Sequence, residues 1–151
     1  MENIIEALSA NTFNYEDIKL KSYLFLKNNN IEYDINVIIG FRGRKEFLKP
    51  LIDSFNKSFD YYDAKIGGKK FCLTFVEHSS NMEAKDLIEP DNSYIWTPGN
   101  VENQYSRSFA YNFGVKYSNR AKFYILHDID ILVKENFFEE VFANLKDNKC
   151  M

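Results

Sequence analysis

Two aspartates, one residue apart, follow a hydrophobic run near the end of the chain. The run reads FYILHDIDILV over residues 123–133 and contains Asp128 and Asp130. Asp is depleted in strands and costly to bury without a partner, so this pair calls for an explanation. Three roles fit the pattern: a polar strand end, a site for a divalent cation, or a carboxylate nucleophile that attacks phosphate.

The cation site is the most specific of these roles. Strand alternation would place Asp128 and Asp130 on one side and His127 on the other, which argues against His127 as a ligand. Two carboxylates at a strand end suit Mn²⁺ or Mg²⁺, with diphosphate oxygens and water as the other ligands. A phosphoaspartate enzyme would need later Ser/Thr and Lys motifs, yet only 21 residues follow Asp130. The polar strand end stays an alternative.

Cationic side chains follow an earlier apolar run. Phe41, Arg42, Gly43 and Arg44 come directly after INVIIG. A guanidinium group donates in a fixed fork, and a glycine lets backbone approach closely, so this turn suits a phosphate or a ribose. The alternative is a solvated basic turn that precedes a helix.

Further candidates lie at the next strand end and at a helix start. Glu77 ends the run KFCLTFVEH and could accept a nucleobase N–H or pair with an arginine, while His78 is interpreted as an exposed loop residue. Arg107 falls near the amino end of a predicted helix, where the helix dipole disfavours a cation. An anionic ligand would compensate for that position, and an ordinary surface arginine is the alternative.

The elements that must position these residues alternate along the chain. Apolar runs predict strands over residues 35–41, 70–78, 94–97 and 123–126, and helical spacing follows over residues 46–59, 105–117 and 137–145. This alternation predicts an α/β fold with a Rossmann-like, mostly parallel sheet and flanking helices. Ligands of such sheets bind beyond the carboxyl ends of the strands, where all the candidate residues fall.

Composition excludes several classes of protein. The chain has 151 residues, of which 45% are hydrophobic, and a net charge of −3, so it carries no general basic field for nucleic acid. No apolar stretch is long enough for a spanning helix, and the N-terminus carries acids where a secretory signal would carry bases. We expect a cytoplasmic protein without a transmembrane segment, either free or peripheral to the inner face of a membrane.

Three motifs in order resemble a known family. The stretches IIGFRGR, YSRSFAYNFGV and FYILHDIDIL resemble the nucleotide-sugar-binding half of GT-A glycosyltransferases, of the β-1,4-galactosyltransferase type and related bacterial polysaccharide (capsule) enzymes. The match runs over residues 35–133. Departures from the family pattern are Gly43, Ser106 and Ser108, where the family has Asn, Asn and Ala.

The resemblance implies a role for each candidate residue. Phe41, Arg42 and Arg44 would contact the uridine and the diphosphate. Tyr105 would stack near the uracil, with Arg107 beside it. Asp128 would face the ribose, and Asp130 would ligate the Mn²⁺ or Mg²⁺ ion that bridges the diphosphate.

The resemblance also implies an activity. It predicts an enzyme, a metal-dependent glycosyltransferase (hexosyltransferase) that moves a hexose or N-acetylhexosamine from a UDP-sugar to a glycan acceptor in polysaccharide biosynthesis. Residues 1–34 would be an N-terminal helical segment and residues 35–151 the donor-binding domain, truncated before the acceptor half that holds the catalytic base. The alternative is a non-catalytic nucleotide-sugar-binding or assembly module. Either function is compatible with a homodimer.

Overall fold

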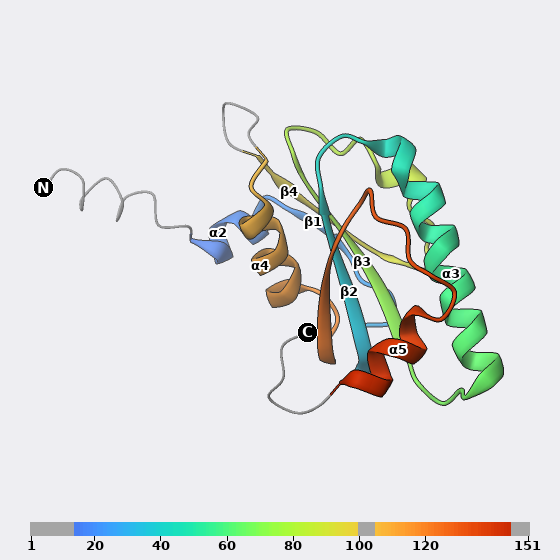
Figure 1. Cartoon of the computed structure of the whole chain (residues 1–151). Coiled ribbons are helices and arrows are strands. Elements are labelled where there is room, and N and C mark those ends of the chain that lie inside the picture. Colours follow the sequence, from blue (N-terminus) through green and yellow to red (C-terminus); the bar gives the residue numbers. More distant parts are fainter. Residues whose placement is uncertain (1–13, 100–104, 146–151) are drawn as a thin grey trace, which may run out of the picture.

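The computed structural model describes residues 14–99 and 105–145, which form a five-stranded sheet with helices on both faces (Figure 1). The strand order is β1-β4-β3-β2-β5. The strands are β1 (Tyr23–Phe25), β2 (Tyr33–Phe41), β3 (Phe71–Ser79), β4 (Ser93–Pro98) and β5 (Ala121–Asp128). All neighbouring strands pair in parallel except β1, which is antiparallel to β4. The predicted α/β fold with a mostly parallel sheet is therefore confirmed.

Helices cover the two faces of this sheet. α3 (Leu48–Lys65) and α5 (Phe137–Asn144) lie on one face, whereas α4 (Arg107–Tyr117) and α2 (Tyr15–Leu20) lie on the other. Two short 3₁₀ turns, η1 (Lys45–Phe47) and η2 (Lys85–Leu87), complete the described elements. Pro50 lies in the first turn of α3, where a missing backbone N–H costs nothing. Within the described residues, no helix combines the length and apolar character that crossing a bilayer requires.

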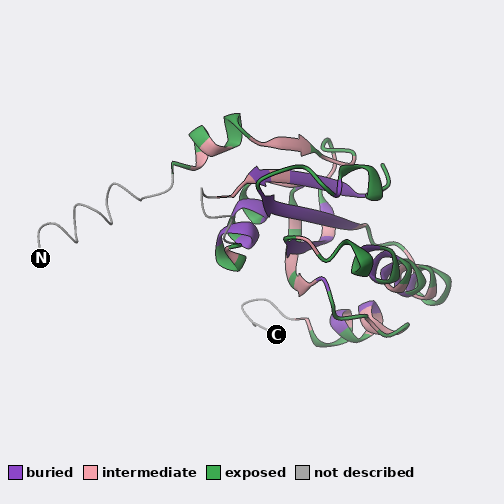
Figure 2. Ribbon diagram, turned by 90° about the horizontal axis from the view of Figure 1, so that it is seen from above, coloured by how far each residue is buried: buried purple, intermediate pink, exposed green. Residues whose placement is uncertain are grey.

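Strand β2 lies between β3 and β5 and is almost wholly buried. Ile35, Val37 and Ile39 face the core under α3 and α5, and Ile38 faces the core under α4. All four side chains are fully buried. Seen from above, the central strands are buried and the edge strands are partly exposed (Figure 2). A continuous apolar run is typical of a strand buried on both faces, and burial on both faces is what the packing produces.

The N-terminal part of the chain differs from the helical segment expected over residues 1–34. Residues 15–20 are helical, but residues 23–25 form β1, which joins the sheet of the main domain. Tyr23 lies opposite Trp96 and Phe25 lies opposite Tyr94. Cross-strand aromatic pairs stabilise a sheet, and this long-range pairing overrides weak local helical propensity. Residues 1–13 fall outside the described part of the chain.

Buried hydrogen bonds hold the amino ends of the strands. Asn36 Nδ2 donates to Ser118 Oγ at 2.9 Å, and Thr74 Oγ1 donates to Asn36 Oδ1 at 2.7 Å. Ser93 Oγ donates to Asn119 Oδ1 at 2.7 Å, and Asn119 Nδ2 donates to the Lys27 carbonyl at 2.7 Å. Satisfied buried networks of this kind specify one arrangement of the strands. The carboxyl ends of the strands are left for the candidate site.

Candidate functional site

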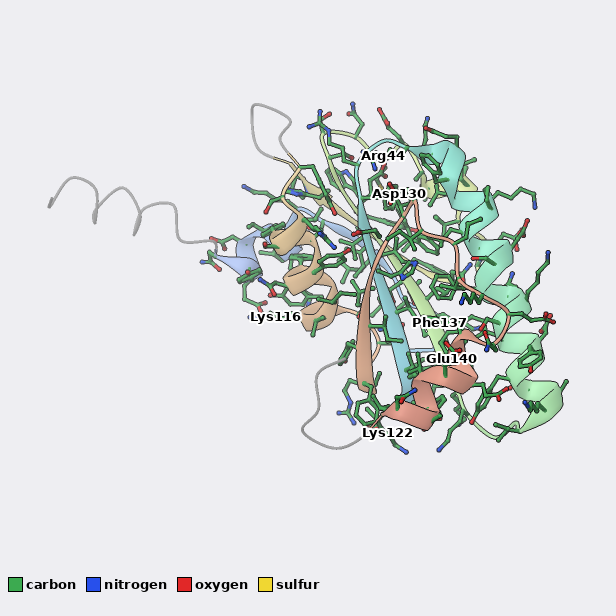
Figure 3. The ribbon with its side chains drawn as sticks, in the orientation of Figure 1. Arg44, Lys116, Lys122, Asp130, Phe137 and Glu140 are labelled. Carbon is green, nitrogen blue, oxygen red and sulfur yellow. The ribbon has the colours of Figure 1, made fainter. Side chains whose placement is uncertain are left out.

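A cavity of about 550 Å³ lies beyond the carboxyl ends of β2, β3 and β5. Its lining residues are Gly40, Phe41, Arg42, Gly43, Arg44, Ser79, Ser80, Glu83, Tyr105, Arg107, Asp128, Ile129 and Asp130. In Figure 3 the labelled Arg44 and Asp130 lie at this end of the sheet, whereas Lys122 and Glu140 lie at the opposite end. The structure thus brings together seven of the eight predicted site residues, all except Glu77.

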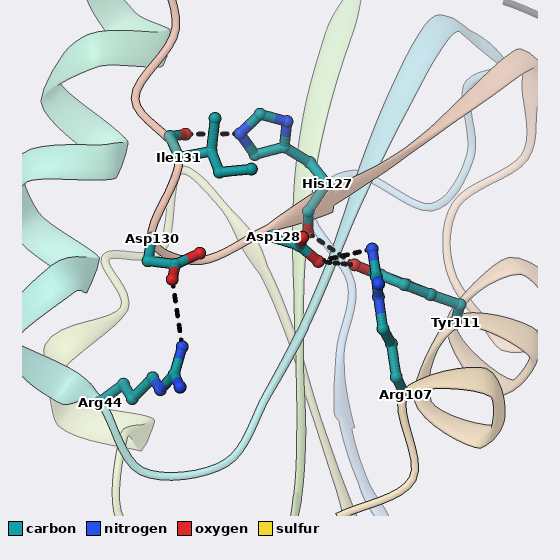
Figure 4. Close-up of polar contacts among 7 residues, drawn as sticks. All are labelled: Arg44, Arg107, Tyr111, His127, Asp128, Asp130 and Ile131. Carbon is teal, nitrogen blue, oxygen red and sulfur yellow. Dashed lines mark hydrogen bonds and ion pairs between the residues drawn. The ribbon is translucent and has the colours of Figure 1, made fainter.

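The turn after β2 has an unusual backbone. Gly43 and Arg44 both have positive φ, at 63° and 53°. A left-handed conformation is ordinary for glycine but uncommon for arginine, so the local structure must hold Arg44 in place. Arg44 Nη1 donates to Asp130 Oδ2 at 3.2 Å (Figure 4). This ion pair connects the turn after β2 with the turn after β5.

Asp128 is the last residue of β5 and is held by two side chains from α4 (Figure 4). Arg107 Nη2 lies 2.8 Å from Asp128 Oδ1, and Tyr111 Oη donates to the same oxygen at 2.9 Å. Tyr111 Oη also lies 3.0 Å from the His127 carbonyl oxygen. The Arg107 guanidinium stands over the Tyr111 ring, 5.4 Å from its centroid. The Asp128 carboxylate is therefore fixed in orientation at the cavity wall.

Tyr111 is a site residue that the sequence analysis missed. It lies four residues after Arg107, so the two side chains share one face of α4. That spacing was the available signal, but it does not reveal that a hydroxyl group reaches the end of β5. Ser79, Ser80 and Glu83 are further lining residues without an earlier assignment.

Both aspartates line the same cavity, but strand alternation is not what brings them together. β5 ends at Asp128, and Asp130 belongs to the turn that follows. Each carboxylate consequently pairs with a different arginine. The His127 ring points away from both carboxylates, and its Nε2 lies 2.6 Å from the Ile131 carbonyl oxygen (Figure 4).

The donor set at the cavity fits a hard divalent cation only in part. Side chains of Asp128 and Asp130 are 36% and 43% exposed, so oxygen ligands are accessible. Over residues 14–99 and 105–145, no group of three or more His, Cys, Asp or Glu side chains is arranged to hold a metal ion. Mn²⁺ or Mg²⁺ would therefore need phosphate oxygens and water to complete its coordination, as Mg²⁺ commonly does.

Glu77 does not reach the cavity, contrary to its predicted role in nucleotide binding. Its side chain is fully buried on the α3 face of the sheet, and Oε1 accepts a hydrogen bond from Tyr94 Oη at 2.5 Å. The backbone N–H groups of Glu83 and Ala84 donate to the same oxygen at 3.1 and 3.2 Å. Burial and this contact with Glu77 raise the pKa of Tyr94. Glu77 holds the loop that carries Glu83. Of these two glutamates, Glu83 lines the cavity and Glu77 does not.

The segment before α4 brings Tyr105 to the cavity. α4 begins at Arg107, so Tyr105 precedes the helix and Ser106 caps it, with Ser106 Oγ accepting from the Phe109 N–H at 3.2 Å. A Cβ atom at Gly40 would lie 2.8 Å from Tyr105 Oη. Gly40 therefore provides the space that the tyrosine occupies, and burial raises the pKa of Tyr105.

His78 is not the exposed loop residue that the sequence suggested. Only 7% of the residue is exposed, and Nδ1 accepts a hydrogen bond from the Ser106 N–H at 3.2 Å. Burial lowers the pKa of His78 and outweighs the opposite effect of the Ser106 and Pro98 backbone groups, while the positive charge of Arg42 acts in the same direction as burial. This histidine belongs to the support of the site.

Comparison of the chain with protein-family models and with curated protein sequences gives no match.

Proposed function

We propose that the cavity binds a UDP-sugar together with Mn²⁺ or Mg²⁺, and that it is the donor-binding site of a metal-dependent glycosyltransferase that acts on a glycan acceptor. The observation that carries this proposal is the convergence of Arg42, Arg44 and Arg107 with Asp128 and Asp130 around one cavity at the carboxyl ends of parallel strands. Such edges are where open α/β sheets bind nucleotides.

The charges suit a diphosphate leaving group. Departure of a nucleoside diphosphate from a sugar leaves negative charge, which preorganised cations stabilise. Arg42 and Arg44 come from the turn after β2, and Arg107 comes from the start of α4, so they approach the cavity from two elements. Guanidinium groups match phosphate oxygens in a bidentate manner, which lysines would not do.

The aspartates supply the anionic side of the site. Asp130 would ligate the cation, with Asp128 next to it orienting Arg107 and facing the ribose. When bound, the divalent ion supplies charge neutralisation at the diphosphate. Tyr105 offers an aromatic surface for the base, and its place against Gly40 holds that ring at the cavity.

A non-catalytic nucleotide-sugar-binding module is the second candidate function. The observation in its favour is that Asp128 and Asp130 each already pair with an arginine, so the cavity's remaining lining carboxylate is Glu83. A transferase requires a positioned base for the acceptor hydroxyl group. A binding module requires only the donor pocket.

Calorimetric titration with UDP and ADP, each with and without Mn²⁺, tests the proposal. We expect UDP to bind with metal and to bind more tightly than ADP. Arg120→Ala is a control variant that should bind UDP as the natural protein does. Arg120 is an exposed arginine at the amino end of β5, 3.8 Å from Glu32 and at the opposite end of the strand from the cavity. Equal affinity for UDP and ADP, or no binding of UDP with metal, would overturn the uridine assignment. Metal-dependent release of UDP from a bound UDP-sugar separates the enzyme from the binding module.

A further inference from the structure

His78 connects the end of β3 with the start of α4. Its Nδ1 accepts the Ser106 N–H at 3.2 Å, and its ring packs 4.8 Å from the Phe109 ring and 6.2 Å from the Tyr105 ring. The residue lines no part of the cavity. These three contacts lead to the segment that brings Tyr105 and Arg107 there.

Ser106 is held from both sides. Its hydroxyl oxygen accepts the Phe109 N–H as the cap of α4, while its own backbone N–H donates to His78. A helix cap contributes about 1 kcal/mol on average, so the cap alone leaves the entry of the chain weakly fixed. The bond to His78 adds a long-range constraint to the residue between Tyr105 and Arg107.

We propose that His78 is a positioning residue for the nucleotide site: its unprotonated Nδ1 holds Ser106, and Ser106 in turn sets the positions of Tyr105 and Arg107. The inference rests on the proposed function for the identity of the ligand. The contact between His78 and Ser106 is independent of it.

The arrangement requires the neutral imidazole. A proton on Nδ1 would face the Ser106 N–H donor, and the hydrogen bond would be lost. The charged or titratable groups that face the ring in the described part of the chain are Arg42 from the turn after β2 and Tyr105 from the segment before α4. β4 presents Thr97 opposite His78, and the Pro98 carbonyl group nearby, neither of which titrates.

Burial favours the neutral form, because it lowers the pKa of His78 below its ordinary value of 6.5. The positioning contact is therefore present at neutral pH. It is lost in acid, as pH falls through the lowered pKa.

Two substitutions distinguish the effect of the hydrogen-bond acceptor of His78 from the effect of its aromatic ring. In His78→Asn, the amide oxygen takes the place of Nδ1 without a titrating group, whereas His78→Phe keeps a ring of similar shape without an acceptor. The probe is UDP with Mn²⁺, measured by calorimetry at neutral and mildly acidic pH. We expect His78→Phe to weaken UDP about tenfold, the equivalent of one hydrogen bond. His78→Asn should bind as the natural protein does at neutral pH and more tightly than it in acid.

Hydrogen exchange of the Ser106 amide gives a readout that needs no ligand. We expect slow exchange in the natural protein and in His78→Asn, and faster exchange in His78→Phe. If His78→Phe does not fold, His78→Gln is used as the variant without an acceptor at the Nδ1 position. The amide oxygen of glutamine extends past that position. Equal Ser106 exchange in the natural protein and in the variant without the acceptor would overturn the inference. Unchanged UDP affinity in that variant would overturn it as well.

Failure of the natural protein to bind UDP would count against the proposed function. The exchange of the Ser106 amide would still decide whether His78 holds this segment. The two failures are thus distinguishable.

Discussion

Arg44 Nη1 lies 3.2 Å from Asp130 Oδ2, which ties the turn after β2 to the turn after β5. The two side chains are 60% and 43% exposed, and ion pairs in such surroundings contribute little to folding stability. A divalent cation would bind Asp130 more strongly than Arg44 does, and a phosphate group would bind Arg44 more strongly than Asp130 does. Ligands can therefore replace this ion pair without a large loss of folding stability.

The two aspartates should differ in their effect on metal dependence. Asp130→Asn should abolish the dependence of UDP binding on Mn²⁺, because a neutral amide is a poor ligand for a hard cation. Asp128→Asn should weaken UDP but keep the metal dependence, since it loosens Arg107. Calorimetry of both variants over a range of Mn²⁺ concentrations measures this. Identical losses in both would show that the roles are shared.

Arg107 should contribute to binding and not to folding. Its guanidinium group is largely exposed beside Asp128, so Arg107→Ala should leave the free energy of unfolding almost unchanged. The affinity for UDP should fall by about 1.5–3 kcal/mol, as for the loss of a hydrogen bond to a charged group. Denaturant unfolding and calorimetry give the two quantities, with Arg120→Ala as control. A folding defect with normal affinity would make Arg107 structural.

Two glycine substitutions should separate stability from binding. A Cβ atom at Gly40 would lie 2.8 Å from Tyr105 Oη and 3.0 Å from Ala110 Cβ. A Cβ atom at Gly114 would lie 2.6 Å from Ile38 Cγ2 and 2.8 Å from Val76 Cγ2, away from the cavity. Both Gly→Ala variants should lose roughly 1–3 kcal/mol of stability through overpacking.

The affinity for UDP should fall only in Gly40→Ala, because only that change displaces Tyr105. Melting temperature and UDP affinity are measured on the folded fraction of each variant. An equal loss of affinity in Gly114→Ala would mean that α4 moves as a whole.

Folding stability should depend on His78 in acid. Burial lowers the pKa of this residue in the folded protein, so folding favours its neutral form. Its stabilising contribution is therefore complete above the unfolded value near 6.5 and declines as pH falls through the lower folded value. Denaturant unfolding across this range should show a steeper acid loss in the natural protein than in His78→Asn. Parallel profiles would contradict the expectation.

Residues 1–151 should release UDP from a UDP-sugar slowly, with water as the acceptor. General base catalysis typically supplies about 10²–10⁴-fold, and Asp128 and Asp130 at the cavity each pair with an arginine. Release of UDP from radiolabelled UDP-glucose and UDP-galactose, with and without glycan acceptors, measures the rate. Robust acceptor-dependent turnover would contradict this prediction. Glu83, and not the buried Glu77, would then be the first carboxylate to replace.

Much of the architecture could be predicted from local sequence patterns. The run INVIIGF predicted a strand, and alternation of strands with helices predicted a mostly parallel sheet. The carboxyl ends of parallel strands share one edge of a sheet, so the convergence of Arg42, Arg107 and Asp128 followed from topology and not from any contact visible in the sequence.

Only the tertiary structure decided the partners of these residues. Arg44 and Asp130 are separated by 86 residues in the chain, and His78 and Ser106 by 28. Hydrophobic periodicity reports which face of an element is buried, but it carries no information about which distant polar group lies opposite. Glu77 for that reason looked like a ligand-binding carboxylate, although Tyr94 and two backbone N–H groups hold it inside the protein.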